Sequence, residues 1–535
     1  MSELERIAMF MGGADSIPEF LSHSAGRYRH QTAVEAKQDG ERLQKTYLQL
    51  KSDSDALSAA FEARGLSQKH VAFIGGLSYE WLVAFFGVTG SSNIAVPMDK
   101  DLSLDDLVTL VLQADISMLF VDSSMSHIVQ QLRHSCETLE VIVCFQAGGP
   151  FPSIAEFIRD TRCSEKLRST HVDADQTAMI VFTSSETGGY KGAMLSHRNI
   201  CHNIICSVYL AGIEAFEPGG CTVVVLPPHH MFAVTSGMLV PLLFYGLTLC
   251  LSGGLSGYLS SIQQFRPSVL FMVPMLVEGL HKRISREAAR TGQLNLEFFG
   301  GQLRTIICGG AYLDAEWVVK YKKLGVNLLN GYGITECSPL VSCNRPNGII
   351  SHSVGLVGPE PYCRVRIEDD EIQVQGSIVM KQYYKDCKST AEAFDQGWFR
   401  TGDLGYLDQH NYLYITGRKK DLIILKDGNN ISPVGIEQSI ERHPLVDQSL
   451  VYADGKKGGE TLAAIIHPDY DYAVNNGYTD VRLALDELIQ MLNDNSPAFR
   501  RIRRLEVSEK PFDKLALKKE LRAPTRITRE KVNHD

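Results

Sequence analysis

The stretch TAMIVFTSSETGGYKG, residues 177–192, joins a short apolar run to a loop rich in glycine and hydroxyl side chains. The apolar run has the length and the residue types of a buried strand. The loop after it ends at Lys191, and it offers the hydroxyl donors, converging backbone N–H groups and cation that a phosphate group requires. The same residue types dominate ordinary turns, and Gly192 after Lys191 excludes a Walker A loop.

Apolar runs similar to TAMIVFT recur along the first two-thirds of the chain. They alternate with helical patterns such as SYEWLVAFFGVTG (78–90) and DAEWVVKYKKLG (314–325). Strands that alternate with helices predict parallel sheets covered by helices, so this part of the chain is expected to be α/β. The further runs are HVAFIGG (70–76), SMLFVD (117–122), EVIVCF (140–145), CTVVVLP (221–227), SVLFMVP (268–274) and LRTIICGG (303–310).

After about residue 350 the pattern changes to alternating strands, CRVRIEDDEIQVQG (363–376) and YLYITGR (412–418), which predict a small β-rich subdomain. The segment beyond GRKKD (417–421) contains further strands and a charged tail. We therefore expect an α/β fold with a large N-terminal domain of helix-covered parallel sheets that includes the β-rich subdomain. A small, mobile α+β domain follows it, and the two domains are expected to comprise residues 1–420 and 421–535.

Composition narrows the function. The chain has 535 residues and a formal net charge of −9, which argues against nucleic acid or an anionic membrane as the main partner. No apolar stretch reaches the roughly 20 residues that span a bilayer, and the first residues do not have the pattern of a secretory signal. The 12 cysteines occur without CxxC pairs, which favours reduced thiols and a cytoplasmic location.

Three further stretches have residues suited to a nucleotide. NGYGITE (330–336) combines glycines with an aromatic face, a hydroxyl donor and a carboxylate, although it also fits a strand that ends in a polar turn. In GWFRTGDLGYL (397–407), Asp403 is either a turn former or an acceptor for two ribose hydroxyls. In GRKKDLIILKDGNNISPVGIE (417–437), Arg418 is either an exposed charge or a ligand contact.

Together with TSSETGGYKG (183–192), these stretches resemble the signatures of the acyl-adenylate-forming superfamily. That superfamily includes acyl-CoA synthetases, luciferases and the adenylation domains of peptide synthetases. The resemblance covers nearly the whole chain, and the order and spacing of the motifs make a chance match unlikely. It implies an enzyme that uses ATP and Mg²⁺. The loop residues that it assigns to the β- and γ-phosphates are Thr183, Ser184, Ser185, Glu186, Thr187, Gly188 and Lys191.

The resemblance also implies roles in the other motifs. Tyr332 stacks on adenine, Thr335 contacts the α-phosphate, and Glu336 binds Mg²⁺, which suits a carboxylate that shares the ion with substrate phosphates. Asp403 contacts the ribose hydroxyls, and Arg418 contacts the ribose and a phosphate. The remaining implied contacts are glycines and small residues near the adenine and the acyl pocket, namely Gly309, Gly310 and Ala311 in CGGAYL (308–313) and Asn330, Gly331 and Gly333 in NGYGITE.

The stretch LPPHHMFAVTSG (226–237) is expected to border the acid substrate. It lacks the HExxH spacing of a zinc site. By resemblance, His230 lies beside the substrate carboxylate, and Met231 replaces the aspartate with which amino-acid-activating relatives bind the α-amino group. The apolar stretch GMLVPLLFYGLTLCLSGG (237–254) is expected to form a helix near His230. A fatty or other apolar acid is therefore favoured, and aryl acids remain open.

The segment PFDKLALKKELR (511–522) resembles the part of the family that contains the adenylation lysine. Lys514 is the preferred match, while Lys518 and Lys519 remain competitors because the run also fits a solvated basic helix. The resemblance further implies that the C-terminal domain rotates about Asp421. Gly428 would then face the pantetheine of the thiol substrate.

The resemblance implies a reaction in two steps. The acid first attacks the α-phosphate of MgATP to give acyl-AMP and pyrophosphate, and a thiol, expected to be CoA, then displaces AMP. Two alternatives remain open, a ligase that loads the phosphopantetheine of an acyl carrier protein, and a relative with impaired ATP activation that acts as an acyltransferase or binding protein. The serine in GGADSI (12–17) resembles a phosphopantetheine attachment site, but a helix N-cap at Ser16 or Asp15 is favoured.

The phosphate loop departs from the family form, which is close to TSGTTGxPKG. Ser185, Glu186 and Tyr190 replace a glycine, a threonine and a proline. If the Glu186 carboxylate points inward, we expect it to repel the triphosphate or to pair with Lys191. If it points to solvent, screening leaves it with little effect.

Overall fold

In the computed structural model, the chain forms two compact units. The large unit comprises residues 1–366, 373–401 and 407–414, and the small unit comprises residues 367–372, 402–406 and 415–535. The structure describes all residues except 39–40, 161–171, 185–188, 214, 253, 255–256, 292–299, 426–429, 455–460, 515–516, 518–520 and 522–535.

One sheet of the large unit has seven strands in the order β18-β8-β7-β4-β3-β5-β6. From β7 to β6 the neighbouring strands are parallel, as the alternation with helices predicts. Strand β8 pairs antiparallel with β7, so the stretch at 177–192 forms a hairpin. The strands are β3 (His70–Ile74), β4 (Ile94–Met98), β5 (Ile116–Val121), β6 (Val141–Cys144), β7 (Thr177–Ser184), β8 (Tyr190–Ser196) and β18 (Gln382–Tyr383).

A second sheet has the order β15-β14-β13-β12-β11-β9-β10-β1-β2 in the large unit. Strands β13, β12, β11, β9, β10 and β1 are parallel to their neighbours, and antiparallel strands lie at both ends of this group. The strands are β1 (Thr32–Gln38), β2 (Glu41–Thr46), β9 (Cys221–Val224), β10 (Thr248–Leu251), β11 (Val269–Met272), β12 (Thr305–Cys308), β13 (Asn327–Gly333), β14 (Leu340–Cys343) and β15 (Gly355–Val357).

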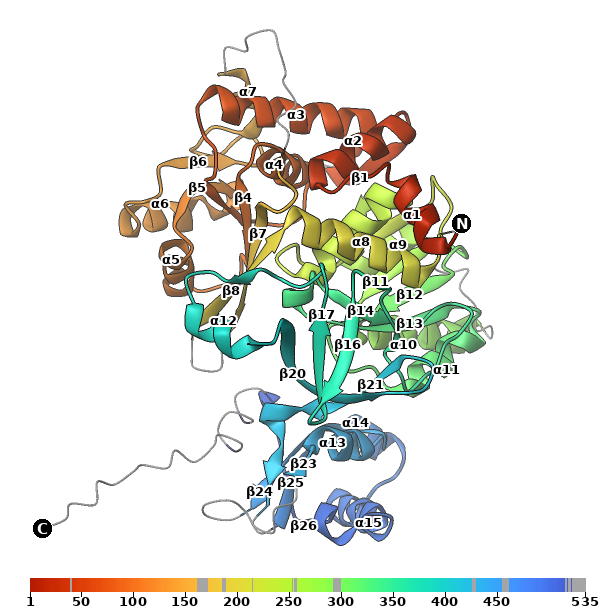
Figure 1. Cartoon of the computed structure of the whole chain (residues 1–535). Coiled ribbons are helices and arrows are strands. Elements are labelled where there is room, and N and C mark those ends of the chain that lie inside the picture. Colours follow the sequence, from red (N-terminus) through yellow and green to blue (C-terminus); the bar gives the residue numbers. More distant parts are fainter. Residues whose placement is uncertain are drawn as a thin grey trace, which may run out of the picture. The chain divides into compact units, whose positions relative to one another are not determined.

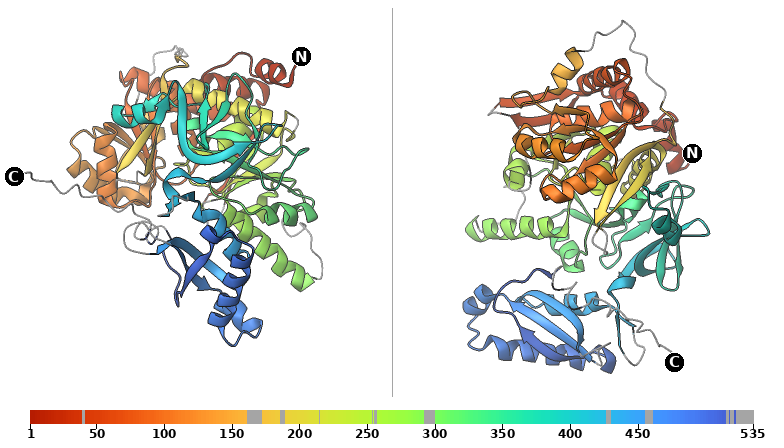
Figure 2. Two further views of the ribbon diagram at one scale, coloured as in Figure 1. Left: turned by 60° about the horizontal axis from the view of Figure 1, so that its bottom comes forward. Right: turned by 90° about the vertical axis from the view of Figure 1, so that its left-hand side faces the viewer.

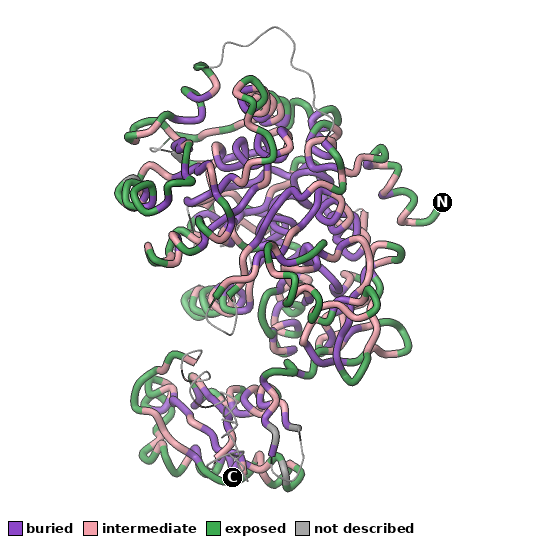
Figure 3. Tube along the Cα trace, turned by 60° about the vertical axis from the view of Figure 1, so that its left-hand side comes forward, coloured by how far each residue is buried: buried purple, intermediate pink, exposed green. Residues whose placement is uncertain are grey.

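Helices cover these sheets, and the cores lie between helices and strands (Figure 1). Figure 3 shows that the strands inside the large unit are buried and that the outer helix faces are exposed. The helices are α1 (Glu3–Phe10), α2 (Ile17–Arg27), α3 (Tyr47–Ala63), α4 (Tyr79–Gly90), α5 (Leu104–Gln113), α6 (Ser126–Ser135), α7 (Ile154–Arg159), α8 (His197–Ala211), α9 (Tyr258–Phe265), α10 (Pro274–Thr291), α11 (Ala315–Lys323) and α12 (Cys387–Ala393), with the 3₁₀ turns η1 (Ser123–Met125) and η5 (Thr335–Cys337).

Local capping explains where the helices begin. The Ser78 side chain accepts a hydrogen bond from the backbone N–H of Trp81, and Asp314 does the same for Glu316, so α4 and α11 begin where the sequence patterns predict. Helix α2 begins after Ser16, and the Glu19 carboxylate accepts hydrogen bonds from the backbone N–H groups of Asp15 and Ser16. The prediction of an N-cap at this serine is confirmed.

The apolar stretch 237–254 is not one helix. Residues Phe232–Phe244 form the π-helix η2, with Pro241 inside it, and the chain then turns at Gly246 into strand β10. Gly246 has a φ of +69°, and a Cβ atom there would lie 2.6 Å from the Tyr28 ring. The helix is therefore shorter than the sequence predicts, because this turn requires a glycine.

The β-rich region after residue 350 contains β16 (Arg364–Glu368), β17 (Glu371–Gln375), β19 (Phe394–Asp395), β20 (Trp398–Leu407) and β21 (Tyr412–Arg418). Its sheet order is β16-β17-β20-β21, with β19 paired to β20. The hairpin turn 367–372 and the middle of β20 belong to the small unit. The predicted β-rich subdomain is thus confirmed, although both units share its strands.

The rest of the small unit is an α+β layer, as predicted. Its three-stranded sheet has the order β24-β25-β26, and α13 and α15 pack against it around one apolar core (Figure 2). The elements are η6 (Lys419–Asp421), β22 (Ile423–Ile424), β23 (Asn430–Ile431), α13 (Pro433–Glu441), β24 (Val446–Asp454), β25 (Thr461–Pro468), α14 (Tyr470–Asn475), α15 (Val481–Asp494), η7 (Ala498–Arg500) and β26 (Ile502–Val507). Within the described part of the chain, no helix has the length and apolarity needed to cross a membrane.

Candidate active site

The carboxyl ends of neighbouring parallel strands bring two sequence motifs together. Met272 at the end of β11 pairs with Cys308 at the end of β12, and Cys308 pairs with Asn330 in β13. The predicted residues Gly309, Gly310 and Ala311 follow β12 directly. In open α/β sheets this edge is where ligands bind.

The glycines of this edge allow close approach of the backbone. A Cβ atom at Gly331 would lie 3.2 Å from the carbonyl oxygen of Ser342, and one at Gly333 would clash with the backbone of Pro339. A Cβ atom at Gly309 would lie 3.4 Å from the carbonyl oxygen of Gly331. Packing against the backbone of Pro339 therefore requires a glycine at position 333, while the contact at Gly309 is an ordinary one.

The turn after β13 presents the polar side chains of NGYGITE. Tyr332 is buried in β13, while Thr335 and Glu336 begin the 3₁₀ turn η5 and are partly exposed. The Tyr383 hydroxyl donates a 2.8 Å hydrogen bond to Glu336 Oε1. The backbone carbonyl of Glu336 accepts a second hydrogen bond from the backbone N–H of Met380, at 2.7 Å.

Glu336 is suited to bind Mg²⁺. Its carboxylate is partly exposed, and among the described residues its side-chain partner is the neutral hydroxyl of Tyr383. Magnesium commonly takes one or two carboxylates together with substrate phosphates and waters. Among the described residues, no group of three or more His, Cys, Asp or Glu could hold a metal ion by itself.

The hairpin formed by β7 and β8 is connected to this carboxylate by the side chain of Tyr383. Strand β18 carries Tyr383 and pairs with β8. In the hairpin, Thr183 is opposite Lys191, and the Thr183 hydroxyl is 3.4 Å from the Lys191 carbonyl oxygen. The Lys191 Nζ atom lies 5.3 Å from the centroid of the Tyr383 ring. Ser184 is opposite Tyr190, and the predicted loop residues Ser185, Glu186, Thr187 and Gly188 lie outside the described residues.

The two histidines after β9 lie against each other. The ring centroids of His229 and His230 are 4.1 Å apart, and His229 Nε2 is 3.7 Å from a carboxylate oxygen of Asp99. Desolvation lowers the pKa of His229 to about 4, and it also lowers the pKa of His230. His230 is solvent accessible, while Met231 is buried. Because its pKa lies below the ordinary histidine value, His230 is neutral at physiological pH.

The small unit pairs the two predicted ribose contacts with each other. Arg418 Nε lies 2.8 Å from Asp403 Oδ1, and the Asp403 side chain is 4% exposed. Beside them, Lys419 Nζ lies 2.9 Å from Glu371 Oε2, and Glu371 is equally buried. Asp421 is buried at the end of η6, and Gly428 lies outside the described residues.

Lys514 is anchored in the small unit by two carboxylates of α13. Its Nζ atom lies 2.8 Å from Glu441 Oε1 and 3.6 Å from Glu437 Oε2. Both glutamates are held in turn by β24, because Glu437 accepts a hydrogen bond from the Val451 N–H and Glu441 accepts one from the Ser449 N–H. The competitors Lys518 and Lys519 lie outside the described residues.

The edge of the parallel sheet thus presents the Glu336 carboxylate, and Tyr383 connects it to Lys191 of the β7–β8 hairpin. The comparisons give the family. The chain belongs to the AMP-binding enzymes: the model of that family matches residues 21–384, and the model of the AMP-binding enzyme C-terminal domain matches residues 420–522. The predicted superfamily and the predicted type of enzyme, an AMP-forming acid–thiol ligase, are confirmed.

Curated relatives are ligases of acids with CoA. The chain is 26% identical to the long-chain-fatty-acid–CoA ligase FadD15 of Mycobacterium bovis over 72% of this chain and 71% of that protein. It is also 26% identical to the indoleacetate–CoA ligase of Aromatoleum aromaticum, over 84% of this chain and 88% of that protein. These names include both alkyl and aryl acids.

Solved structures confirm the predicted fold class. The anthranilate CoA ligase AuaEII in complex with anthranoyl-AMP superposes with a TM-score of 0.80 at 18% identity, covering 95% of this chain and 97% of that chain. ATP-bound MatB from Rhodopseudomonas palustris gives a TM-score of 0.77 at 24% identity, covering 94% and 98%.

Sequence reasoning missed Tyr383. The residue belongs to none of the four motifs, and its relation to Glu336 and Lys191 arises only where β18 pairs with β8. The available signal was the pair of tyrosines in KQYYKD (381–386), aromatic residues in an otherwise polar run.

Proposed function

We propose that this protein activates an apolar carboxylic acid with ATP to form acyl-AMP and pyrophosphate, and then transfers the acyl group to CoA. The observation that carries the proposal is the partly exposed Glu336 carboxylate, oriented by a neutral hydroxyl and linked through Tyr383 to Lys191 of the phosphate hairpin. This is the arrangement that a magnesium–triphosphate substrate requires. Family membership and the CoA ligases among the relatives support it.

In the first step, the acid carboxylate attacks the α-phosphorus of ATP and pyrophosphate leaves. Lys191 and the hydroxyl groups of the hairpin hold the β- and γ-phosphates, and Thr335 holds the α-phosphate. Glu336 would hold Mg²⁺, which supplies charge stabilisation on the phosphate oxygens. The neutral ring of His230 borders the acid without a cationic charge, and Lys514 meets the negative charge that develops at the α-phosphate.

In the second step, the thiol of CoA attacks the acyl carbonyl and AMP leaves. We propose that residues 421–535 rotate about Asp421 between the steps, which removes Lys514 and brings Gly428 toward the pantetheine. The match to the C-terminal family model begins at residue 420, which supports a boundary at this position. Rotation of a small domain about a few residues at an element end is a common mode of closure.

The acid is expected to be apolar. Met231 offers no carboxylate for an amino group, and η2 beside His230 is apolar and buried along most of its length. Fatty acids are the first candidates. Aryl acids are the second, because relatives include the indoleacetate ligase as well as the FadD15 protein. A carrier-protein acceptor has no support among these relatives.

Exchange of labelled pyrophosphate into ATP, measured with a panel of acids, tests the proposal. We expect exchange with octanoate or palmitate and little with alanine, and a thioester product by mass when CoA is added. Glu336→Gln should reduce exchange strongly, while Glu392→Gln, which alters an exposed carboxylate of α12, should not. Absence of exchange with every acid would contradict the proposal. Exchange with indoleacetate alone would replace the fatty acid by an aryl acid.

A further inference from the structure

Tyr383 is held in place by a segment that crosses between two motifs. Residues 377–384 pass close to η5 and then to β8, and their backbone is hydrogen-bonded to both elements. The N–H of Met380 donates to the carbonyl of Glu336 at 2.7 Å, and the N–H of Tyr384 donates to the carbonyl of Gly192 at 2.7 Å. Ser338 Oγ donates to the carbonyl of Ile378 at 2.9 Å. The segment is therefore fixed to the carboxylate motif and to the phosphate hairpin at once.

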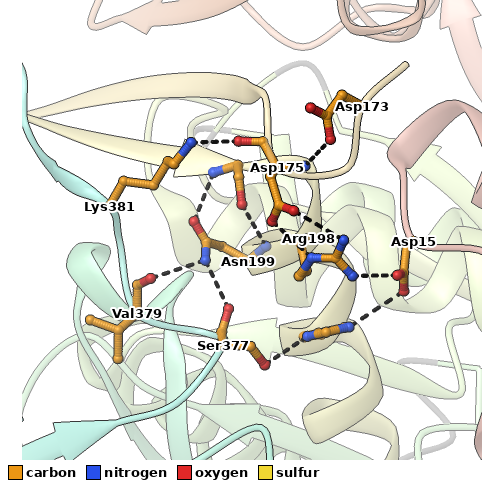
Figure 4. Close-up of polar contacts among 10 residues, drawn as sticks. Asp15, Asp173, Asp175, Arg198, Asn199, Ser377, Val379 and Lys381 are labelled. Atoms are coloured by element: carbon orange, nitrogen blue, oxygen red, sulfur yellow. Dashed lines mark hydrogen bonds and ion pairs between the residues drawn. The ribbon is translucent and has the colours of Figure 1, made fainter. Parts of the chain in front are cut away.

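Helix α8 holds the beginning of the same segment (Figure 4). Asn199 Nδ2 donates to the carbonyl oxygens of Ser377 and Val379, at 2.8 and 3.0 Å. A His202 ring nitrogen lies 2.6 Å from Ser377 Oγ. Next to Asn199, Arg198 bridges Asp15 and Asp175, and Lys381 Nζ donates to the carbonyl of Asp175 at 2.6 Å. These contacts limit how far Tyr383 can move.

The side chain of Tyr383 has two partners of opposite charge. Its hydroxyl donates to Glu336 Oε1 at 2.8 Å, and its ring lies under the Lys191 ammonium at 5.3 Å. The side chain of Tyr383 is buried, which holds its hydroxyl and its ring against these two partners. A carboxylate with one oxygen fixed in this way presents the other in a defined direction.

We propose that Tyr383 is a positioning residue that orients Glu336 toward Mg²⁺ and Lys191 toward the triphosphate. The proposal rests on the function proposed above. A group that hydrogen-bonds a metal ligand fixes its orientation, and loss of such a group commonly costs about 10- to 100-fold in metal affinity. The face of an aromatic ring attracts an ammonium group and so limits where Lys191 can lie.

Nucleotide binding by calorimetry tests this without turnover. The ligand is the α,β-methylene analogue of ATP, titrated once with Mg²⁺ and once with EDTA, and the measured quantity is the gain in affinity that Mg²⁺ gives. We expect Tyr383→Phe to reduce this gain about tenfold and to leave binding in EDTA nearly unchanged. Tyr383→Leu should weaken binding in EDTA as well, because it removes the ring under Lys191.

Tyr384→Phe is the matched control. The Tyr384 hydroxyl donates its hydrogen bond to Asp115 and not to Glu336. Removing it should therefore leave the gain in affinity from Mg²⁺ at the wild-type value. In a Glu336→Gln background, Tyr383→Phe should cause no further loss of this gain. A further loss there, or equal losses in Mg²⁺ and EDTA, would assign Tyr383 a merely structural role and overturn the proposal.

The wild-type protein separates the two proposals. If it binds the analogue and Tyr383→Phe retains the full gain from Mg²⁺, the positioning role is wrong and the proposed function stands. If the wild type does not bind the analogue under either condition, the proposed function fails, and the positioning role fails with it. Melting temperatures of all variants report whether each one is folded.

Discussion

Lys514 has two carboxylate partners in its own unit. Glu441 and Glu437 lie 2.8 and 3.6 Å from its ammonium group, and Glu437 is nearly fully buried. If this lysine acts on the α-phosphate, the phosphate must replace both glutamates as its anionic partner. The lysine is 40% exposed, so the exchange does not require removal of a deeply buried charge.

We predict that Lys514→Ala reduces acyl-AMP formation by at least about 100-fold, because only this step requires a cation at the α-phosphate. Thioester formation from supplied acyl-AMP should be largely retained. Pyrophosphate exchange and thioester assays measure the two steps, and Lys510→Ala, which alters an exposed lysine of the same segment, is the control. Equal loss in both steps would contradict the assignment.

His197 is a fully buried histidine without a charge partner in contact. Its Nδ1 accepts a 3.4 Å hydrogen bond from the N–H of Ile17, and its Nε2 has no hydrogen-bond partner in the described structure. Desolvation lowers its pKa to about 4, although the charges of Glu19 and Asp173 act in the opposite direction. The fold therefore keeps this ring neutral.

This predicts a loss of stability in mild acid. The unfolded chain protonates His197 near pH 6.5 while the folded chain does not, so the free energy of unfolding falls as the pH decreases from about 6.5 to 4. The full decrease in the free energy of unfolding that follows from this pKa difference is about 3 kcal/mol. Urea unfolding at pH 7.5 and 4.5 should show a smaller difference for His197→Asn than for the wild type. His410→Asn, at an exposed site, should keep the wild-type difference.

At the scale of elements, the turn from β13 to η5 depends on Gly333. A Cβ atom there would lie 2.9 Å from the carbonyl carbon of Pro339 and closer still to its oxygen. We predict that Gly333→Ala destabilises the protein by about 1–3 kcal/mol, because the turn that carries Thr335 and Glu336 must shift. Melting temperature and pyrophosphate exchange should both fall. Gly26→Ala, in helix α2 with nothing within 4 Å, is the control and should not lower either.

The elements themselves were largely predictable. The apolar runs became β3, β5, β6, β7, β9, β11 and β12, because each is short, buried and bounded by polar residues or glycine. The partner of a strand was not predictable in the same way. Strand β8 pairs antiparallel with β7, and nothing local in YKGAMLS (190–196) indicates this. The apolar helix near His230 was expected and is present as η2, but its end before Gly246 was not predicted, because that end depends on contact between Gly246 and Tyr28, far apart in sequence.

The candidate site was predictable as a set of residue types but not as a set of contacts. The sequence indicated Glu336 and Lys191, while Tyr383 between them required the pairing of β18 with β8. Asp403 and Arg418 were each assigned to ribose, yet they are paired with each other. Side-chain partners of this kind are set by tertiary packing, which local sequence patterns do not report. The hinge at Asp421 and the nucleotide contacts stay predictions.

At the scale of the whole molecule, we propose that Lys514 enters the site for the first step and leaves it for the second. We predict that Asp421→Pro reduces overall turnover by roughly 100-fold, the order of loss that a misplaced catalytic group causes. Proline fixes φ near −65° and so prevents rotation at this residue. One half-reaction should persist while the other falls. Asp421→Ala removes the side chain without this constraint, and a similar loss in both variants would contradict a hinge role.

The small unit is assembled from three separate stretches of chain, 367–372, 402–406 and 415–535. The pairs Asp403–Arg418 and Glu371–Lys419 join the last stretch to the first two, and both carboxylates are nearly inaccessible to water. A buried carboxylate that loses its cation is left with an uncompensated charge, which destabilises the fold. Recombination between this gene and a homologue would therefore be tolerated better with a crossover after Lys419 than with one between Glu371 and Arg418, because the latter would separate an acid from its own cation.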